Sequence, residues 1–193
     1  MGDWGYDYDG AGNLRTQTDA RSCQTTLAYD PLNRLESKTF SGPGACDTTP
    51  DIIYFYDSYD DFPSYTPVQD HPVGRRTGMT DGTGRTIWEY DARGRATRED
   101  KTISGQNFVT GWSYNSADQV ETMTYPDGEV LTYEPNTSGD LRSLKNAQNY
   151  YYVSETWYDE AGRIRQLNRG GVLGGTYTYY PWSDATIGGQ LFT

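Results

Sequence analysis

Hydrophobic and polar residues alternate with a period of two in short stretches along the chain. In all but one stretch an apolar residue stands two positions before a tyrosine, as Leu27 does before Tyr29 and Trp88 before Tyr90, and the exception is Thr156 before Tyr158. Alternation of this kind places one set of side chains on one face of a β-strand. No segment has a sustained helical period, so the pattern predicts an all-β chain.

The alternating stretch recurs along the whole sequence and is centred each time on a tyrosine. These repeat tyrosines are Tyr8, Tyr29, Tyr56, Tyr90, Tyr114, Tyr133, Tyr158 and Tyr179. Recurrence about every 20 to 25 residues, with insertions, is typical of a repeat array rather than of a conventional domain. We therefore expect residues 1–193 to form a single array of about seven or eight repeats.

Turn-forming residues follow the repeat tyrosines. Four copies combine an aspartate directly after the tyrosine, at Asp9, Asp30, Asp91 and Asp159, with Gly12, Asn33, Gly94 or Gly162 three positions later. An aspartate at the first turn position accepts hydrogen bonds from the backbone amides ahead of it. Glycine and asparagine tolerate the positive φ of a turn that closes into a bulge. Each copy therefore predicts a β-hairpin.

Two copies depart from this pattern. The segment 57–76 is dense in Asp and Pro, and we expect it to be a long excursion that leaves the sheet. The copy at Tyr133 has Glu134 in place of the aspartate and two more residues before Gly139, which predicts a wider turn. Since no helix is predicted to cover the aromatic face, the strip must coil, pack against a larger protein or associate with copies of itself. Coiling is the favoured outcome.

Composition narrows the possible partners. The chain is 34% hydrophobic but 15% aromatic, so its apolar surface is made mainly of rings. A net charge of −11 argues against nucleic acid and anionic membranes, which need a basic surface. No apolar run is long enough for membrane insertion. The first residues do not resemble a signal peptide, so we expect the sequence to start at a cloning boundary or to be an internal fragment.

The two cysteines could form a disulfide or remain free thiols. Cys23 and Cys46 flank one repeat, and a Gly-Pro-Gly stretch before Cys46 could fold it back toward Cys23. A disulfide would imply an oxidising compartment, whereas two free thiols would imply nothing about location. Both readings remain open at this point.

Several stretches resemble the YD repeats of RHS-repeat proteins. They are YDYDGAGNLRTQTD, YDPLNRLESKTF, TDGTGRTIWEYDARGRATRE, MTYPDGEVLTY and TWYDEAGRIRQLN. The resemblance runs from about Tyr6 to about Tyr180 and leaves mainly the excursion after Tyr56 unexplained. The family includes bacterial RHS polymorphic toxins, the shell subunits of Tc insecticidal toxins, and teneurins.

The resemblance implies a fold and a role. In that family the repeats form a β-strip that coils into a hollow shell, which in bacterial members encloses a toxic C-terminal polypeptide. It implies that this chain is a piece of shell wall, secreted or at the cell surface of a bacterium, with structural repeat tyrosines between neighbouring hairpins. Its partners would be the rest of a larger RHS protein or the enclosed polypeptide. The family's Asp- and Pro-rich self-cleaving motif has no counterpart after Tyr180, so neither protease nor toxin activity is implied.

The sequence contains few candidates for catalytic or metal-binding residues. The single histidine, His71, lies beside a proline, and no nucleophile elbow, phosphate loop or zinc motif is present. We therefore expect no enzyme activity and no cofactor. Four aspartates of the excursion could hold a cation, although a solvated acidic loop is the favoured reading. These aspartates are Asp57, Asp60, Asp61 and Asp70.

Aromatic residues outside the repeat register give the alternative hypothesis. Trp157 and Trp182 do not share the tyrosine positions, so they are candidates for a ligand surface that stacks on sugars. The sequence thus favours a structural shell segment. The alternative is an extracellular module that binds carbohydrate or a cell surface, or that assembles with itself through its edge strands.

Overall fold

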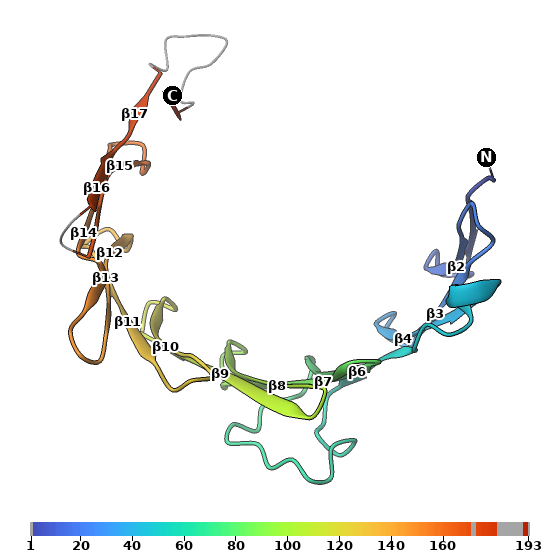
Figure 1. The fold of residues 1–193 in the computed structure, drawn as a ribbon. Coiled ribbons are helices and arrows are strands. Elements are labelled where there is room, and N and C mark those ends of the chain that lie inside the picture. The colour runs from blue at the N-terminus through green and yellow to red at the C-terminus, as the bar shows by residue number, and fades with distance from the viewer. Residues whose placement is uncertain (1, 171–172, 181–190, 193) are drawn as a thin grey trace. The chain divides into compact units, whose positions relative to one another are not determined.

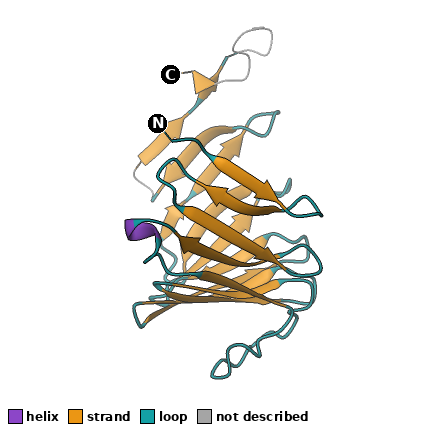
Figure 2. Ribbon diagram, turned by 90° about the vertical axis from the view of Figure 1, so that its right-hand side faces the viewer, coloured by secondary structure: helices purple, strands orange, loops and turns teal. Residues whose placement is uncertain are grey.

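The computed structural model describes residues 2–170, 173–180 and 191–192, and these residues form β-strands with one short 3-10 turn, Gly44–Cys46 (Figure 2). This confirms the all-β prediction. The strands are β1 (Gly5–Tyr8), β2 (Leu14–Thr18), β3 (Gln24–Tyr29), β4 (Leu35–Ser41), β5 (Ile52–Tyr56), β6 (Arg76–Asp81), β7 (Gly84–Tyr90), β8 (Ala96–Ile103), β9 (Gln106–Tyr114), β10 (Val120–Thr124), β11 (Val130–Pro135), β12 (Leu141–Asn146), β13 (Tyr151–Val153), β14 (Glu155–Tyr158), β15 (Ile164–Arg169), β16 (Leu173–Thr176), β17 (Thr178–Tyr179) and β18 (Leu191–Phe192).

The chain divides into two compact units, residues 1–109 and 110–193. In the first unit, β1 to β8 pair with one another in chain order (Figure 1). In the second unit, β9 to β13 pair in chain order, β14 to β16 form a separate sheet, and β17 pairs with β18. The pairs whose registers are resolved are antiparallel, so consecutive strands are joined as hairpins.

A β-bulge lies at the repeat tyrosine of each regular hairpin. The register shifts directly before Tyr8, Tyr29, Tyr90 and Tyr158. The turn residues adopt the positive φ expected from the sequence, with 87° at Gly12 and 61° at Asn33. A turn that ends in a left-handed residue produces such a bulge, so the hairpin prediction is confirmed.

Each strand that carries a repeat tyrosine presents two different faces. On β7, Trp88 and Tyr90 lie on one face, here called the tyrosine face, and the alternate residues Ile87 and Glu89 lie on the opposite face. Ile87 and Glu89 are 0% and 1% exposed, whereas Trp88 and Tyr90 are half-buried. The deepest burial in this part of the strip is therefore on the opposite face.

The insertion, residues 58–73, accounts for this burial. Figure 1 shows the chain leaving the sheet after β5 and returning at β6. Tyr59 and Phe62 of the insertion pack against Ile87 and form the hydrophobic core of the described residues. Phe62 also meets Phe55 edge-on, with ring centroids 5.0 Å apart. Gly78 lies across from Ile87, and a Cβ atom there would clash with the Phe62 ring. The excursion was thus expected to leave the sheet, but it folds back and covers one face of it.

The copy at Tyr133 differs from the expectation in its turn. The turn is not wider: Asn136 N–H donates to Asp140 O at 2.8 Å, and Gly139 closes the turn with φ 93°. The two additional residues, Glu134 and Pro135, lengthen the strand instead. Asn136 accepts the same side-chain hydrogen bonds as the aspartates elsewhere, so the turn forms two positions later. Tyr133 consequently lies two residues further from the turn than the other repeat tyrosines.

The structure has no helix, among its described residues, with the length and apolarity needed to cross a membrane.

Candidate functional site

The turn aspartates organise the hairpin tips. Oδ1 of Asp9 accepts hydrogen bonds from the backbone N–H groups of Ala11 and Asn13, at 2.9 and 2.8 Å. Asp30, Asp91 and Asp159 each accept the same two bonds from residues two and four positions ahead. These turn amides are thereby satisfied at an exposed edge, where they would otherwise depend on water.

An arginine completes three of these turns. The Nε atoms of Arg34, Arg95 and Arg163 donate to Oδ2 of the aspartate four residues earlier, at 2.6, 2.7 and 2.8 Å. These arginines were not among the residues predicted from the sequence. The signal was nevertheless present, because each one directly follows the asparagine or glycine that closes the turn.

The repeat tyrosines join each hairpin to the preceding one. The hydroxyl of Tyr56 donates to the backbone carbonyl of Leu35, the first residue of β4, at 2.9 Å. Four other repeat tyrosines do the same: Tyr29 to Leu14 O (3.0 Å), Tyr90 to Arg76 O (2.7 Å), Tyr158 to Leu141 O (2.8 Å) and Tyr179 to Ile164 O (2.8 Å). Burial raises the pKa of Tyr56, so its hydroxyl remains a donor at neutral pH. We call this arrangement the hairpin junction.

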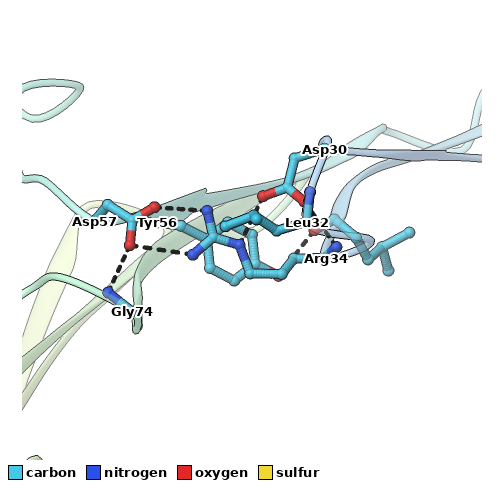
Figure 3. Close-up of polar contacts among 7 residues, drawn as sticks. Asp30, Leu32, Arg34, Tyr56, Asp57 and Gly74 are labelled. Carbon is cyan, nitrogen blue, oxygen red and sulfur yellow. Dashed lines mark hydrogen bonds and ion pairs between the residues drawn. The ribbon is translucent and has the colours of Figure 1, made fainter.

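Figure 3 shows the junction between the second and third hairpins. The guanidinium of Arg34 lies over the Tyr56 ring, 4.4 Å from its centroid, and donates to both carboxylate oxygens of Asp57, at 3.1 and 2.6 Å. Asp57 also accepts the N–H of Gly74 at 2.6 Å. The hydrogen bonds from Arg34, followed by that from Gly74, lower the pKa of Asp57. One arginine therefore holds its own turn and the next hairpin together. Arg163 lies over Tyr179 in the same way, at 4.3 Å.

The segment 57–75 is an enlarged version of the same turn. Asp57 N–H donates to Arg75 O at 3.1 Å, as Asp30 N–H donates to Arg34 O at 2.9 Å. Gly74 has φ 79° and directly precedes Arg75, which matches the closing residues of the regular turns. The guanidinium of Arg75 lies 5.6 Å from the centroid of the Tyr90 ring. The insertion thus lies inside an otherwise ordinary repeat, whereas the sequence pattern predicted only an excursion from the sheet.

A buried carboxylate fastens the insertion to the sheet. Glu89 accepts a hydrogen bond from the Tyr65 hydroxyl at 2.5 Å and from the N–H groups of Val68 and Gln69, at 3.1 and 2.9 Å. The Tyr59 hydroxyl donates to the carbonyl of Trp88 at 3.0 Å. Buried polar groups stabilise a fold only when they are paired, and here the pairing fixes the path of the insertion.

Three of the four candidate cation ligands, Asp57, Asp60 and Asp70, line one hollow of the insertion. Asp57 is engaged by Arg34 and Gly74, and no group of three or more potential metal-ligating side chains occurs among the described residues. Asp60, Asp61 and Asp70 lie on the exposed side of the insertion. Asp57 thus serves as the turn aspartate of its repeat, bound by Arg34 and by the N–H of Gly74.

The two cysteines lie side by side at the open end of the β3–β4 hairpin. Cys23 directly precedes β3 and Cys46 ends the 3-10 turn, and the structure joins them as a disulfide with their Cα atoms 5.6 Å apart. A cross-link between residues 23 positions apart constrains the unfolded chain and therefore stabilises the hairpin.

The remaining predicted residues occupy different environments. Trp157 is 43% exposed and lies on β14 between Thr156 and Tyr158, outside the tyrosine face. Trp182 lies outside the described residues.

Two repeat tyrosines depart from the hairpin junction. Tyr133 contacts Met123 rather than a carbonyl, with its hydroxyl 3.7 Å from Sδ, which follows from its shifted position. Tyr114 ends β9, where Asn115 replaces the turn aspartate.

Comparison with known proteins agrees with this arrangement. Residues 8–42 and 90–130 match the family described as RHS Repeat. No curated protein matches the sequence.

The chain is similar in fold to solved Tc toxin structures. A crystal structure of TcdB2-TccC3 is 15% identical with a TM-score of 0.77, covering 99% of this chain and 10% of the other. The same complex without its hypervariable C-terminal region is 14% identical, also with a TM-score of 0.77 and the same coverage. The Photorhabdus luminescens Tc holotoxin pore is 15% identical with a TM-score of 0.74, covering 98% of this chain and 10% of that one. The chain thus spans about a tenth of the length of these proteins. Two segments of the chain thus match the RHS Repeat family, and its hairpin fold is similar to that of the Tc toxin structures.

Proposed function

We propose that this chain is a structural, non-catalytic segment of an RHS-type shell that encloses a C-terminal polypeptide of the same protein. The observation that carries this proposal is the hairpin junction, which recurs with the same donor and acceptor in five repeats. The repeat tyrosines of the junction bind the backbone of the neighbouring hairpin. A wall that extends by adding equivalent units needs such a junction, because each repeat contacts mainly its neighbours.

The fold comparison supports a larger assembly. The chain covers about a tenth of the TccC3-containing chains that it resembles, and one of those structures has been solved without its hypervariable C-terminal region. A secreted, toxin-associated setting would also provide the oxidising conditions in which the bond between Cys23 and Cys46 persists.

Protease protection tests this proposal in the full-length protein. The C-terminal polypeptide should resist digestion in the intact protein and be degraded when it is expressed alone. The native protein should also have a mass far above 21.7 kDa, the mass of these 193 residues. Equal digestion of the polypeptide in both settings would contradict the proposal.

A second candidate function is binding of cell-surface carbohydrate. It is favoured by Trp157, whose ring is 43% exposed on a strand face that carries no repeat tyrosine. A flat, exposed indole offers an apolar surface with a polar edge, as sugar stacking requires. Binding on a glycan array that is lost in Trp157→Ala would support this function, and an array without signal would remove it.

A further inference from the structure

The connection between β4 and β5, residues 42–51, contacts a neighbouring turn on each side. Cys46 of the connection is bonded to Cys23, which ends the turn between β2 and β3. Pro50 lies against Gly82 in the turn between β6 and β7, where an added Cβ atom would clash with the proline ring. The connection therefore ties together three neighbouring turns along one edge of the first unit.

The backbone pairing that continues from this connection is short. β4 and β5, whose residues the structure describes throughout, pair at two positions, whereas β3 and β4 pair at six. The two pairs are Lys38 with Ile52 and Ser37 with Ile53. At its far end β5 is also held by the hydroxyl of Tyr56, which donates to a carbonyl of β4. The end of β5 nearest the connection thus has little lateral support of its own and depends on the connection for its position.

The disulfide is accessible to a small molecule. Cys23 and Cys46 are only half-buried, and both line a hollow of about 390 Å³ beside the turn between β2 and β3. Gly44 and Asp47, which flank Cys46 in the connection, are exposed. Thiol–disulfide exchange requires a thiolate to reach one of the two sulfur atoms, and this position permits that approach.

We propose that the bond between Cys23 and Cys46 is a reducible latch, which a small-molecule thiol such as glutathione cleaves in the folded chain. A thiolate attacks one sulfur and forms a mixed disulfide, while the other cysteine leaves as a thiolate and takes up a proton. A second thiol then attacks the mixed disulfide and releases the remaining cysteine. Two thiol molecules are thereby oxidised to one disulfide, and the chain gains two electrons and two protons.

Cleavage of the latch should loosen the sheet locally. Cys23 keeps its place, because its N–H donates to the Asp19 carboxylate at 3.0 Å. The connection loses its covalent tie to that turn, so the adjoining end of β5 separates from β4 more often. The biological setting of the latch rests on the proposed function. A shell wall would be firm in an oxidising exterior and would loosen at this point in the reducing interior of a cell.

Reduction of the folded chain tests the inference. The chain is incubated with reduced glutathione in the absence of denaturant, free thiols are alkylated, and their number is read from the mass. Both cysteines should be alkylated while the far-UV circular dichroism stays unchanged. Hydrogen exchange of the amides that join β4 to β5 should accelerate by about tenfold, and exchange in β7 and β8 should keep its rate.

The matched control is the double variant Cys23→Ser, Cys46→Ser. Its β4–β5 amides should exchange at the faster rate both with and without glutathione. Treatment of the reduced native chain with oxidised glutathione should restore the slower rate, because the latch closes again.

Three results would overturn the inference. The first is alkylation that occurs only after denaturation, since the disulfide would then be closed to thiols in the folded chain. The second is reduction that leaves exchange between β4 and β5 unchanged. The third is equal acceleration in β7 and β8, since the disulfide would then hold the whole unit. None of them bears on the enclosure of a C-terminal polypeptide, which protease protection of the oxidised full-length protein measures separately.

Discussion

Strands β5 to β8 and strands β1 to β4 are built from the same repeat, yet they are held together differently. In β5 to β8 the insertion covers one face, and Ile87, Glu89 and Thr77 are almost completely buried. No residue of β1 to β4 is buried to that extent. Those hairpins are held by backbone pairing, by the disulfide and by junctions such as the one between Tyr29 and Leu14.

The difference shows what the repeat alone supplies. Lateral polar contacts define the order and register of these hairpins, because the turn aspartates bind the amides of their own turns and five repeat tyrosines donate to a neighbouring hairpin. A hydrophobic core is added only where a turn carries enough chain to fold back over the sheet. A thin strip of this kind should therefore have uneven local stability along its length.

The largest effect should come from removing the core beneath the insertion. Ile87→Ala should lower the free energy of unfolding by about 2–5 kcal/mol, since a fully buried side chain leaves a cavity. Ile53→Ala, on the same face of β5 but 43% exposed, should cost much less. Chemical denaturation of both variants checks this, and equal losses would show that the insertion does not form a core.

The next effect should come from the buried carboxylate. Glu89→Gln keeps the shape of the side chain but replaces one of its two acceptor oxygens with a donor, so we expect a loss of about 1.5–3 kcal/mol. Hydrogen exchange should accelerate at the amides of Val68 and Gln69, while exchange in β3 stays unchanged. Uniform acceleration in both places would mean that the insertion is not a separate layer.

The junction arginine should have a smaller but specific effect. Arg34→Ala removes its bonds to Asp30 and Asp57 and its contact with Tyr56, and should cost about 1–2 kcal/mol. The matched control is Arg21→Ala. Arg21 is 82% exposed in its side chain and pairs with Asp19 within a single turn, so its loss should be close to zero. Similar losses in the two variants would contradict the importance of contacts between hairpins.

The smallest effect concerns pH and extends the comparison to β11 and β12, which have no insertion. The side chain of Lys145, followed by that of Ser143, donates to Glu134 and lowers its pKa from 4.5 to about 2. The stabilisation from this contact is fully present above pH 4.5 and is lost as the pH falls toward 2. The reason is that Glu134 takes up its proton near pH 4.5 in the unfolded chain but only near pH 2 in the folded one, so acid favours the unfolded state. Glu134→Gln should flatten this part of the pH dependence, whereas Glu121→Gln on β10 should not.

Much of this arrangement was predictable from the sequence. The turn chemistry of Asp30 and Asn33 is local, so the hairpins and their order follow from short stretches of residues. The arginine at the end of three of the turns was missed, although Arg34, Arg95 and Arg163 all follow the closing residue. Its role depends on a residue of the next hairpin, which a pattern within one repeat does not contain.

The burial of Ile87 and Glu89 was not predictable in the same way. Both alternate with the aromatic residues of β7, and the alternation pointed to the tyrosine face as the packed one. The cover comes from residues about 20 positions earlier, whose Asp and Pro content indicated only a loop. The hydrogen bond between Asp57 N–H and Arg75 O makes that loop an enlarged repeat turn. Sequence rules for turns cover only residues a few positions apart, so they do not predict this bond.

The central claim is that junctions of repeat tyrosines join the hairpins, and a single denaturation experiment tests it most directly. One variant replaces by phenylalanine the five tyrosines that donate to a preceding strand: Tyr29, Tyr56, Tyr90, Tyr158 and Tyr179. The control replaces five tyrosines whose hydroxyls make no hydrogen bond among the described residues: Tyr6, Tyr8, Tyr54, Tyr125 and Tyr150. The first variant should lose about 3–5 kcal/mol of unfolding free energy and the control less than about 1 kcal/mol. Equal losses would contradict the claim, because the strip would then be held by its rings and backbone alone.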